Sequence, residues 1–159
     1  MKKCWQYQII FALVSLAAGG LSAILIHNNA DAYYALKKPA LSPPGWVFPI
    51  VWTGIYILMG AGAGLVLSAP RKANRKPLAI GFYAVQLAAN FLWSVLFFKL
   101  ELYKTAFVWL VFLLFLVIVM TVSFGRVSKW AWVLQLPYIV WLIFAAYLNL
   151  SISILNMGL

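Results

Sequence analysis

The sequence predicts an all-α integral membrane protein, a single bundle of five transmembrane helices. Hydrophobic residues make up 66% of the 159 residues and charged residues only 9%. Soluble domains, in contrast, are about half apolar and about a quarter charged. The apolar residues also gather in five runs without charge, each long enough for the roughly 20 residues that cross a bilayer. The length suits one domain over residues 1–159.

The five expected helices cover residues 5–27, 46–68, 78–98, 105–124 and 130–156, and a long loop at about 28–45 joins the first two. Met-Lys-Lys followed by an apolar run also resembles a signal peptide. The run continues to Ile26 and no soluble domain follows it, which favours a first transmembrane helix.

The charges predict the orientation of the bundle. With helices that alternate in direction, eight Lys and Arg residues fall on the side of the N-terminus, and four fall with both acidic residues on the other side. The positive-inside rule therefore places the N-terminus in the cytoplasm and the C-terminus outside. The long loop then lies on the outer face, where long loops often carry function. Basic clusters between apolar runs are typical of membrane proteins, so we expect no nucleic-acid partner.

The second expected helix begins at a stretch of closely spaced prolines that leads into several aromatic residues. Pro43 and Pro44 suit a helix start, where the first N–H groups have no partner within the helix. Phe48, Trp52 and Tyr56 follow at intervals of four residues, so their side chains share one face. A rigid turn therefore leads into a wall of aromatic rings.

The third helix carries its polar residues, Gln86, Asn90 and Ser94, at the same spacing, with Trp93 beside them. Amide side chains commonly bond between membrane helices, and a role in ligand contact is equally open at this point.

In the second helix, Gly60 and Gly64 form a GxxxG motif, which is typical of helix association and favours a homodimer.

The fifth helix presents Tyr138, Trp141, Ala145 and Asn149 on one face, and Ala145 leaves space for a flat molecule. Trp130 and Trp132 suit the interfacial belt, but Trp141 lies too deep for it. Pro137 frees the carbonyl near Val133, so we expect the helix to bend there.

The reactive groups are few. One His, one Cys and two acidic residues provide no paired carboxylates, no Ser-His-Asp triad and no set of metal ligands. Proton-coupled export usually requires an acidic residue inside a transmembrane helix, and none of the predicted helices contains one. What remains is an apolar, aromatic cavity with a few amide and hydroxyl groups, which suits a large, flat, hydrophobic ligand. Lys37 and Lys38 at its mouth would meet carboxylates on the rim of that ligand.

Three separated motifs stand out, namely Lys38-Pro39 with Pro43-Pro44-Gly45-Trp46-Val47-Phe48 and Val51-Trp52, then Asn90-Phe91-Leu92-Trp93-Ser94, and then Pro137-Tyr138-Ile139-Val140-Trp141 with Phe144-Ala145 and Tyr147-Leu148-Asn149. Together they resemble the TspO/MBR family, that of the translocator protein, or peripheral-type benzodiazepine receptor, and the tryptophan-rich sensory proteins. The resemblance implies a five-helix membrane fold, often dimeric, that binds porphyrins such as protoporphyrin IX and benzodiazepine-type drugs. No obligatory cofactor or metal is expected.

The resemblance also implies which residues form the pocket. Trp52 and Trp141 would be its paired tryptophans, and the full expected ligand-binding set is Tyr33, Pro43, Phe48, Trp52, Tyr56, Asn90, Trp93, Ser94, Tyr138, Trp141 and Ala145. Some bacterial members of the family are reported to degrade porphyrin in light with pocket tryptophans, which would give Trp52 and Trp141 a catalytic role. The mitochondrial members bind cholesterol through a basic residue after a tyrosine of the last helix. Here Leu148-Asn149-Leu150-Ser151 follows Tyr147 and no basic residue comes after it.

The leading hypothesis is a protein of a bacterial cell membrane that binds tetrapyrroles and acts in their transport, scavenging or sensing. The first alternative is light-dependent degradation of porphyrin by the pocket tryptophans, since radical chemistry needs no general base. The second is a structural or assembly subunit whose pocket holds only membrane lipid.

Overall fold

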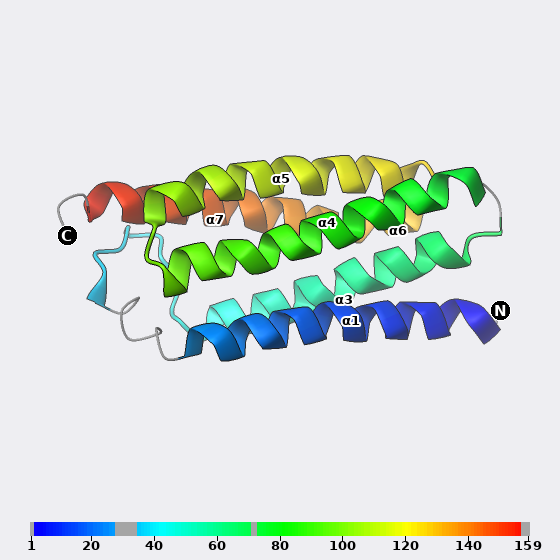
Figure 1. The fold of residues 1–159 in the computed structure, drawn as a ribbon, viewed down its shortest axis with the longest axis horizontal. Helices are drawn as coiled ribbons and strands as arrows, with labels where there is room; N and C mark the ends of the chain where they lie inside the picture. Colours follow the sequence, from blue (N-terminus) through cyan, green and yellow to red (C-terminus); the bar gives the residue numbers. More distant parts are fainter. Residues whose placement is uncertain (1, 28–34, 71–72, 157–159) are drawn as a thin grey trace.

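The computed structural model describes residues 2–27, 35–70 and 73–156, and these form one bundle of long helices (Figure 1). Five stretches of it are long and apolar enough to cross a membrane, as the sequence predicts. In chain order, its helices are α1 (Lys2–Ile26), α3 (Val47–Ser68), the short 3-10 turn η2 (Ala73–Arg75), α4 (Lys76–Ser94), the π-helical turn η3 (Val95–Lys99), α5 (Tyr103–Gly125), α6 (Lys129–Val133) and α7 (Leu136–Leu155).

The fifth span differs from the expectation of one bent helix over residues 130–156. It is divided into α6 and α7, and Pro137 lies in the first turn of α7. Proline has no N–H to bond the carbonyl of Val133, so a new helix starts instead of the old one continuing. Ser128 caps the start of α6 by accepting a hydrogen bond from the backbone N–H of Ala131.

Helix α1 packs closely along α3, and glycines make this approach possible. A Cβ atom added to Gly60 or Gly64 would collide with the backbone of Ala12 or Gln8 in α1. Contact between helix backbones is what the GxxxG motif permits. The motif is therefore used within the chain, between α1 and α3, rather than left open for a second copy.

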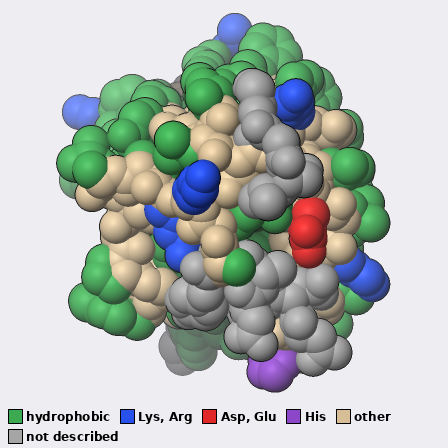
Figure 2. Space-filling view, turned by 90° about the vertical axis from the view of Figure 1, so that its left-hand side faces the viewer, with side chains coloured by type: hydrophobic (Ala, Val, Ile, Leu, Met, Phe, Trp, Pro, Cys, Tyr) green, Lys and Arg blue, Asp and Glu red, His purple; other side chains and the backbone are tan. Residues whose placement is uncertain are grey.

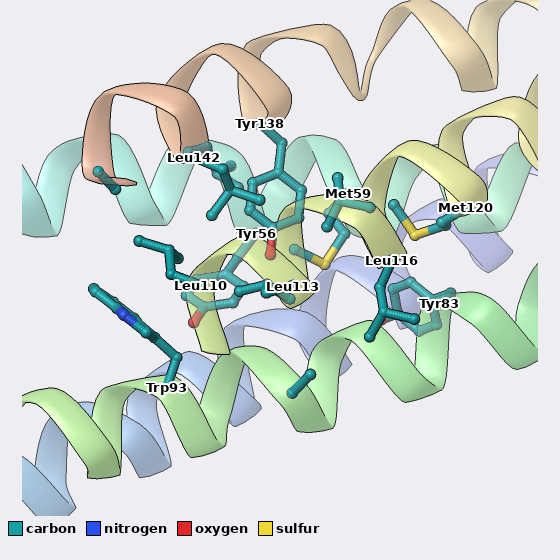
Figure 3. Packing of buried hydrophobic residues seen from close by; sticks show 14 of the residues in the cluster. Tyr56, Met59, Tyr83, Trp93, Leu110, Leu113, Leu116, Met120, Tyr138 and Leu142 are labelled. Atoms are coloured by element: carbon teal, nitrogen blue, oxygen red, sulfur yellow. The ribbon is translucent and has the colours of Figure 1, made fainter. Parts of the chain in front are cut away.

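Helix α5 supplies much of the core and contacts both α4 and α7. Its fully buried residues follow the helical repeat, and Figure 3 shows three of them, Leu110, Leu113 and Met120, turned toward the interior. Large apolar side chains also cover the outside of the bundle, including Leu13, Ile24 and Phe115. Because lipid is as apolar as these side chains, an outer surface of this kind fits a bilayer.

The two ends of the bundle carry the connections. The N-terminus of α1 lies at the same end as the α3–α4 and α5–α6 connections, and residues 35–46 lie at the other end with the C-terminus of α7 (Figure 1). Figure 2 shows this second end, where separate basic side chains, one acidic side chain and the histidine lie at the surface. Lys37 and Glu101 are exposed there.

Candidate functional site

The aromatic wall predicted at the start of α3 is present. A turn closed by a hydrogen bond from the N–H of Val47 to the carbonyl of Pro44, 3.0 Å, leads into the helix. The rings of Trp52 and Tyr56 lie one turn apart on the same face, with centroids 5.7 Å apart. Tyr56 is 8% exposed, so this wall faces the interior of the bundle.

Trp52 is the centre of an aromatic cluster to which three helices contribute. Its ring centroid lies 6.0 Å from that of Trp93 in α4, and 6.1 Å and 6.5 Å from those of Tyr138 and Trp141 in α7. Phe48 contacts Trp141 at 5.9 Å. These separations lie in the range of favourable ring contacts. We call this set of six side chains the aromatic cluster: Phe48, Trp52, Tyr56, Trp93, Tyr138 and Trp141.

A buried hydrogen-bond network joins α3, α4 and α7 at the level of Tyr56, one helical turn after Trp52. The phenol of Tyr56 donates to Oδ1 of Asn90 at 3.0 Å, and Nδ2 of Asn90 donates to the phenol oxygen of Tyr138 at 2.7 Å. Tyr138 in turn donates to Oε1 of Gln86 at 3.1 Å. Figure 3 shows Tyr56 and Tyr138 reaching from α3 and α7 into the same space. The two amide side chains thus bond between helices, which is one of the two roles left open by the sequence.

A third amide side chain, that of Asn149, fixes Trp93. Its indole Nε1–H donates to Oδ1 of Asn149 in α7 at 3.3 Å, and Nδ2 of Asn149 donates to the carbonyl of Tyr103 at 2.9 Å. Asn149 is 1% exposed. It therefore ties α4, α5 and α7 together at the end of the bundle where residues 35–46 lie. The expected site did not include Asn149, although its place one turn after Ala145 was the available signal.

The space beside the cluster is small. A cavity of about 30 Å³ lies between α3, α4, η3 and α7, lined by Phe48, Trp93, Phe97, Phe98, Ala145, Leu148, Asn149 and Ile152. Pockets for drug-sized ligands measure about 300–1,000 Å³. The aromatic side chains thus fill most of the space between these helices, and a large flat molecule would fit there only if the side chains moved apart. The expected ligand-binding set did not include Phe97, Phe98, Leu148 or Ile152, all of which line this cavity.

A larger groove lies between α3 and α7, and Trp141 is one of its lining residues. It has a volume of about 690 Å³ and only apolar or aromatic residues line it, namely Val51, Gly54, Ile55, Leu58, Leu136, Pro137, Val140, Trp141 and Phe144. The indole Nε1–H of Trp141 is buried without a hydrogen-bond partner. Leaving a buried donor without a partner costs about 1–3 kcal/mol of free energy. An acceptor on a ligand would remove this cost.

Three expected residues lie apart from these contacts. Ser94 is 7% exposed and donates to the carbonyl of Asn90 in its own helix at 3.5 Å. Pro43 is half-buried in the loop before α3. Tyr33 lies outside the described residues.

Indole, phenol and amide groups define what the site can do. In the described part of the chain, His, Cys, Asp and Glu form no group of three that would hold a metal ion. The available chemistry is stacking on aromatic faces and hydrogen bonding through amides and hydroxyls. Fold and site together define a multi-pass helical membrane protein with an aromatic site between α3, α4 and α7.

The comparisons place this protein more narrowly. The model of the TspO/MBR family matches residues 10–155, and the chain belongs to that family. It is 37% identical over 142 residues to the tryptophan-rich protein TspO of Chlorobaculum tepidum, covering 89% of this chain and 90% of that one. It is 34% identical to the tryptophan-rich sensory protein of Cereibacter sphaeroides (98% and 95% covered) and 33% identical to the translocator protein of Ovis aries (91% and 87% covered).

Proposed function

We propose that the chain binds a tetrapyrrole such as protoporphyrin IX, and benzodiazepine-type molecules of similar flatness, at the aromatic cluster. The observation that carries the proposal is the position of Trp52, which contacts aromatic rings from both α4 and α7. A flat conjugated ligand that separates these rings replaces ring–ring contacts by stacking of the same kind. Trp141 then gains an acceptor for its unpartnered N–H.

The site opens at the end where residues 35–46 lie. Tyr56, Asn90 and Tyr138 hold the three helices together at the deep end through two short hydrogen bonds. The cavity beside Trp93 lies on the other side of these bonds, towards Ile152 and the end of α7. The exposed side chain of Lys37 is available at this end for the carboxylates of a porphyrin.

The same proposal includes the setting of the protein. Its role is transport, scavenging or sensing of tetrapyrroles in a bacterial cell membrane, surrounded by lipid, with no obligatory cofactor and no nucleic-acid partner. The proposal includes a homodimer on the resemblance to an often dimeric family, since the GxxxG motif is used within the chain. The N-terminus lies in the cytoplasm and the C-terminus outside, because the connections on the N-terminal side carry more basic residues.

Titration of the purified protein in lipid nanodiscs with protoporphyrin IX tests the proposal. We expect the tryptophan fluorescence to fall and to saturate, because the ligand displaces contacts among three tryptophans of the cluster. Quenching that rises linearly without saturation, as for free N-acetyltryptophanamide, would overturn it. That result would favour the alternative in which the pocket and the groove beside Trp141 hold only lipid.

Light-dependent degradation of porphyrin is the second candidate, favoured by the direct contact between the oxidisable indoles of Trp52 and Trp141. Illumination of the complex separates it from simple binding. Loss of the porphyrin absorbance faster than in free porphyrin under the same light would support degradation. Loss at the same rate would reject it and leave binding.

A further inference from the structure

Asn156, the residue that follows α7, is joined to the loop before α3 by two hydrogen bonds to one residue. The backbone N–H of Lys37 donates to Oδ1 of Asn156 at 3.1 Å, and Nδ2 of Asn156 donates to the backbone carbonyl of Lys37 at 3.0 Å. The other amide hydrogen goes to the carbonyl of Ile152 at 2.8 Å. The carboxamide thus pairs with Lys37 much as a neighbouring peptide group would, through one acceptor and one donor.

These bonds lie at one end of the cavity. Ala145, Asn149 and Ile152 line the cavity from α7, and Asn156 follows one turn later on the same face. Asn156 itself is 9% exposed. Leu36, next to the bonded residue, packs against the hydrophobic core. The loop is therefore attached to α7 where the cavity ends.

We propose that Asn156 is a latch, a positioning residue that holds the loop around Lys37 across the end of the aromatic site. Release of its two bonds to Lys37 opens this end, and a flat hydrophobic ligand with carboxylates on its rim then enters or leaves. This inference rests on the proposed function. The deep end of the site is tied by Asn90, and the cavity of about 30 Å³ is too small for a ligand until it opens.

The bonding pattern makes the latch specific to asparagine. Aspartate keeps the acceptor for the N–H of Lys37 but has no donor for its carbonyl, and alanine has neither. Asn156→Asp therefore removes half of the attachment with little change of volume, and Asn156→Ala removes all of it. Asn74→Ala is the matched control, because Asn74 is exposed in η2 at the opposite end of the bundle.

Hydrogen exchange tests the attachment without any ligand. The amide of Lys37 should exchange about tenfold faster in Asn156→Ala than in the unmodified protein, because the loss of its hydrogen bonds removes about that factor of protection. Asn156→Asp should give a smaller change and Asn74→Ala none. Unchanged exchange at Lys37 in both Asn156 variants would overturn the latch.

Stopped-flow mixing with protoporphyrin IX tests its role in ligand exchange. In Asn156→Ala we expect association and dissociation both to accelerate severalfold, with a smaller change in the dissociation constant. A purely structural role would change affinity or thermal stability without accelerating both rates. Faster exchange at Lys37 with both rates within twofold of the unmodified protein would also overturn the latch. If the unmodified protein fails to bind porphyrin while Lys37 exchanges faster in the variant, the proposed function is wrong and the attachment of the loop stands.

Discussion

Trp52 meets Trp141 edge to face, with ring centroids 6.5 Å apart and planes at 88°. Trp52 also contacts Trp93, whereas Trp141 reaches the groove between α3 and α7. A ligand that fills this groove would therefore contact Trp141, which in turn contacts Trp52 at the centre of the aromatic cluster.

Loss of the Asn90 side chain should lower stability more than loss of an exposed asparagine. In Asn90→Ala the phenols of Tyr56 and Tyr138 both lose a partner inside the bundle. A buried polar group left without its partner costs about 1–3 kcal/mol, so the thermal unfolding midpoint in detergent should fall clearly. An unfolding midpoint equal to that of Asn74→Ala would show that this network contributes little.

Gly60, where α3 touches the backbone of α1, should tolerate alanine less well than a glycine with open space around it. Gly60→Ala places a methyl group against the backbone of Ala12, and we expect a destabilisation of about 1–3 kcal/mol from overpacking. Gly81→Ala is the control, because a Cβ there meets no atom within 4 Å and alanine favours the helix. Thermal unfolding of the two variants side by side makes the comparison. Equal stability of the two would contradict the tight contact of α1 with α3.

The amide of Asn149 should orient Trp93 for binding. In Asn149→Ala the indole N–H of Trp93 loses its acceptor, and protoporphyrin IX should bind about fivefold more weakly, as expected for one lost hydrogen bond. Tryptophan quenching measures the affinity. Ser151→Ala, a half-buried position in the same helix, should leave it unchanged. Equal affinity in both variants would remove Asn149 from the site.

The orientation in the membrane can be read from chemical labelling. In a Cys4→Ser background, cysteine at exposed Lys37 should react with a membrane-impermeant maleimide in intact spheroplasts, and cysteine at exposed Lys129 should react only after lysis. The reason is the excess of basic residues on the side of the N-terminus. The reverse pattern of labelling would contradict the proposed orientation.

Local sequence patterns predict the spans and much of the cluster. Runs of apolar residues require helices, and the four-residue spacing of Trp52 and Tyr56 places both rings on one face wherever the helix packs. The break before α7 is harder to predict from the sequence, because Pro137 is compatible with either a bend or a new helix. Only the structure shows that Pro137 lies in the first turn of a separate helix.

Contacts between distant residues are harder to predict. The bonds from Asn156 to Lys37 join residues 119 positions apart, and nothing in the local sequence of either one indicates the other. The small volume of the cavity likewise depends on how side chains from several helices fill the same space. The partner of Gly60 and Gly64 could not be chosen from the motif alone, because the same motif suits α1 or a second copy.

The most direct test of the account is the affinity for protoporphyrin IX of the double variant Trp52→Ala, Trp141→Ala. Its matched control is Trp5→Ala, Trp130→Ala, because these two side chains are 55% and 70% exposed. The loss of two stacking faces, each worth about 1 kcal/mol, should weaken binding at least about tenfold in the first variant, while the control binds like the unmodified protein. Equal affinity in the two double variants would contradict the assignment of the aromatic cluster as the tetrapyrrole site.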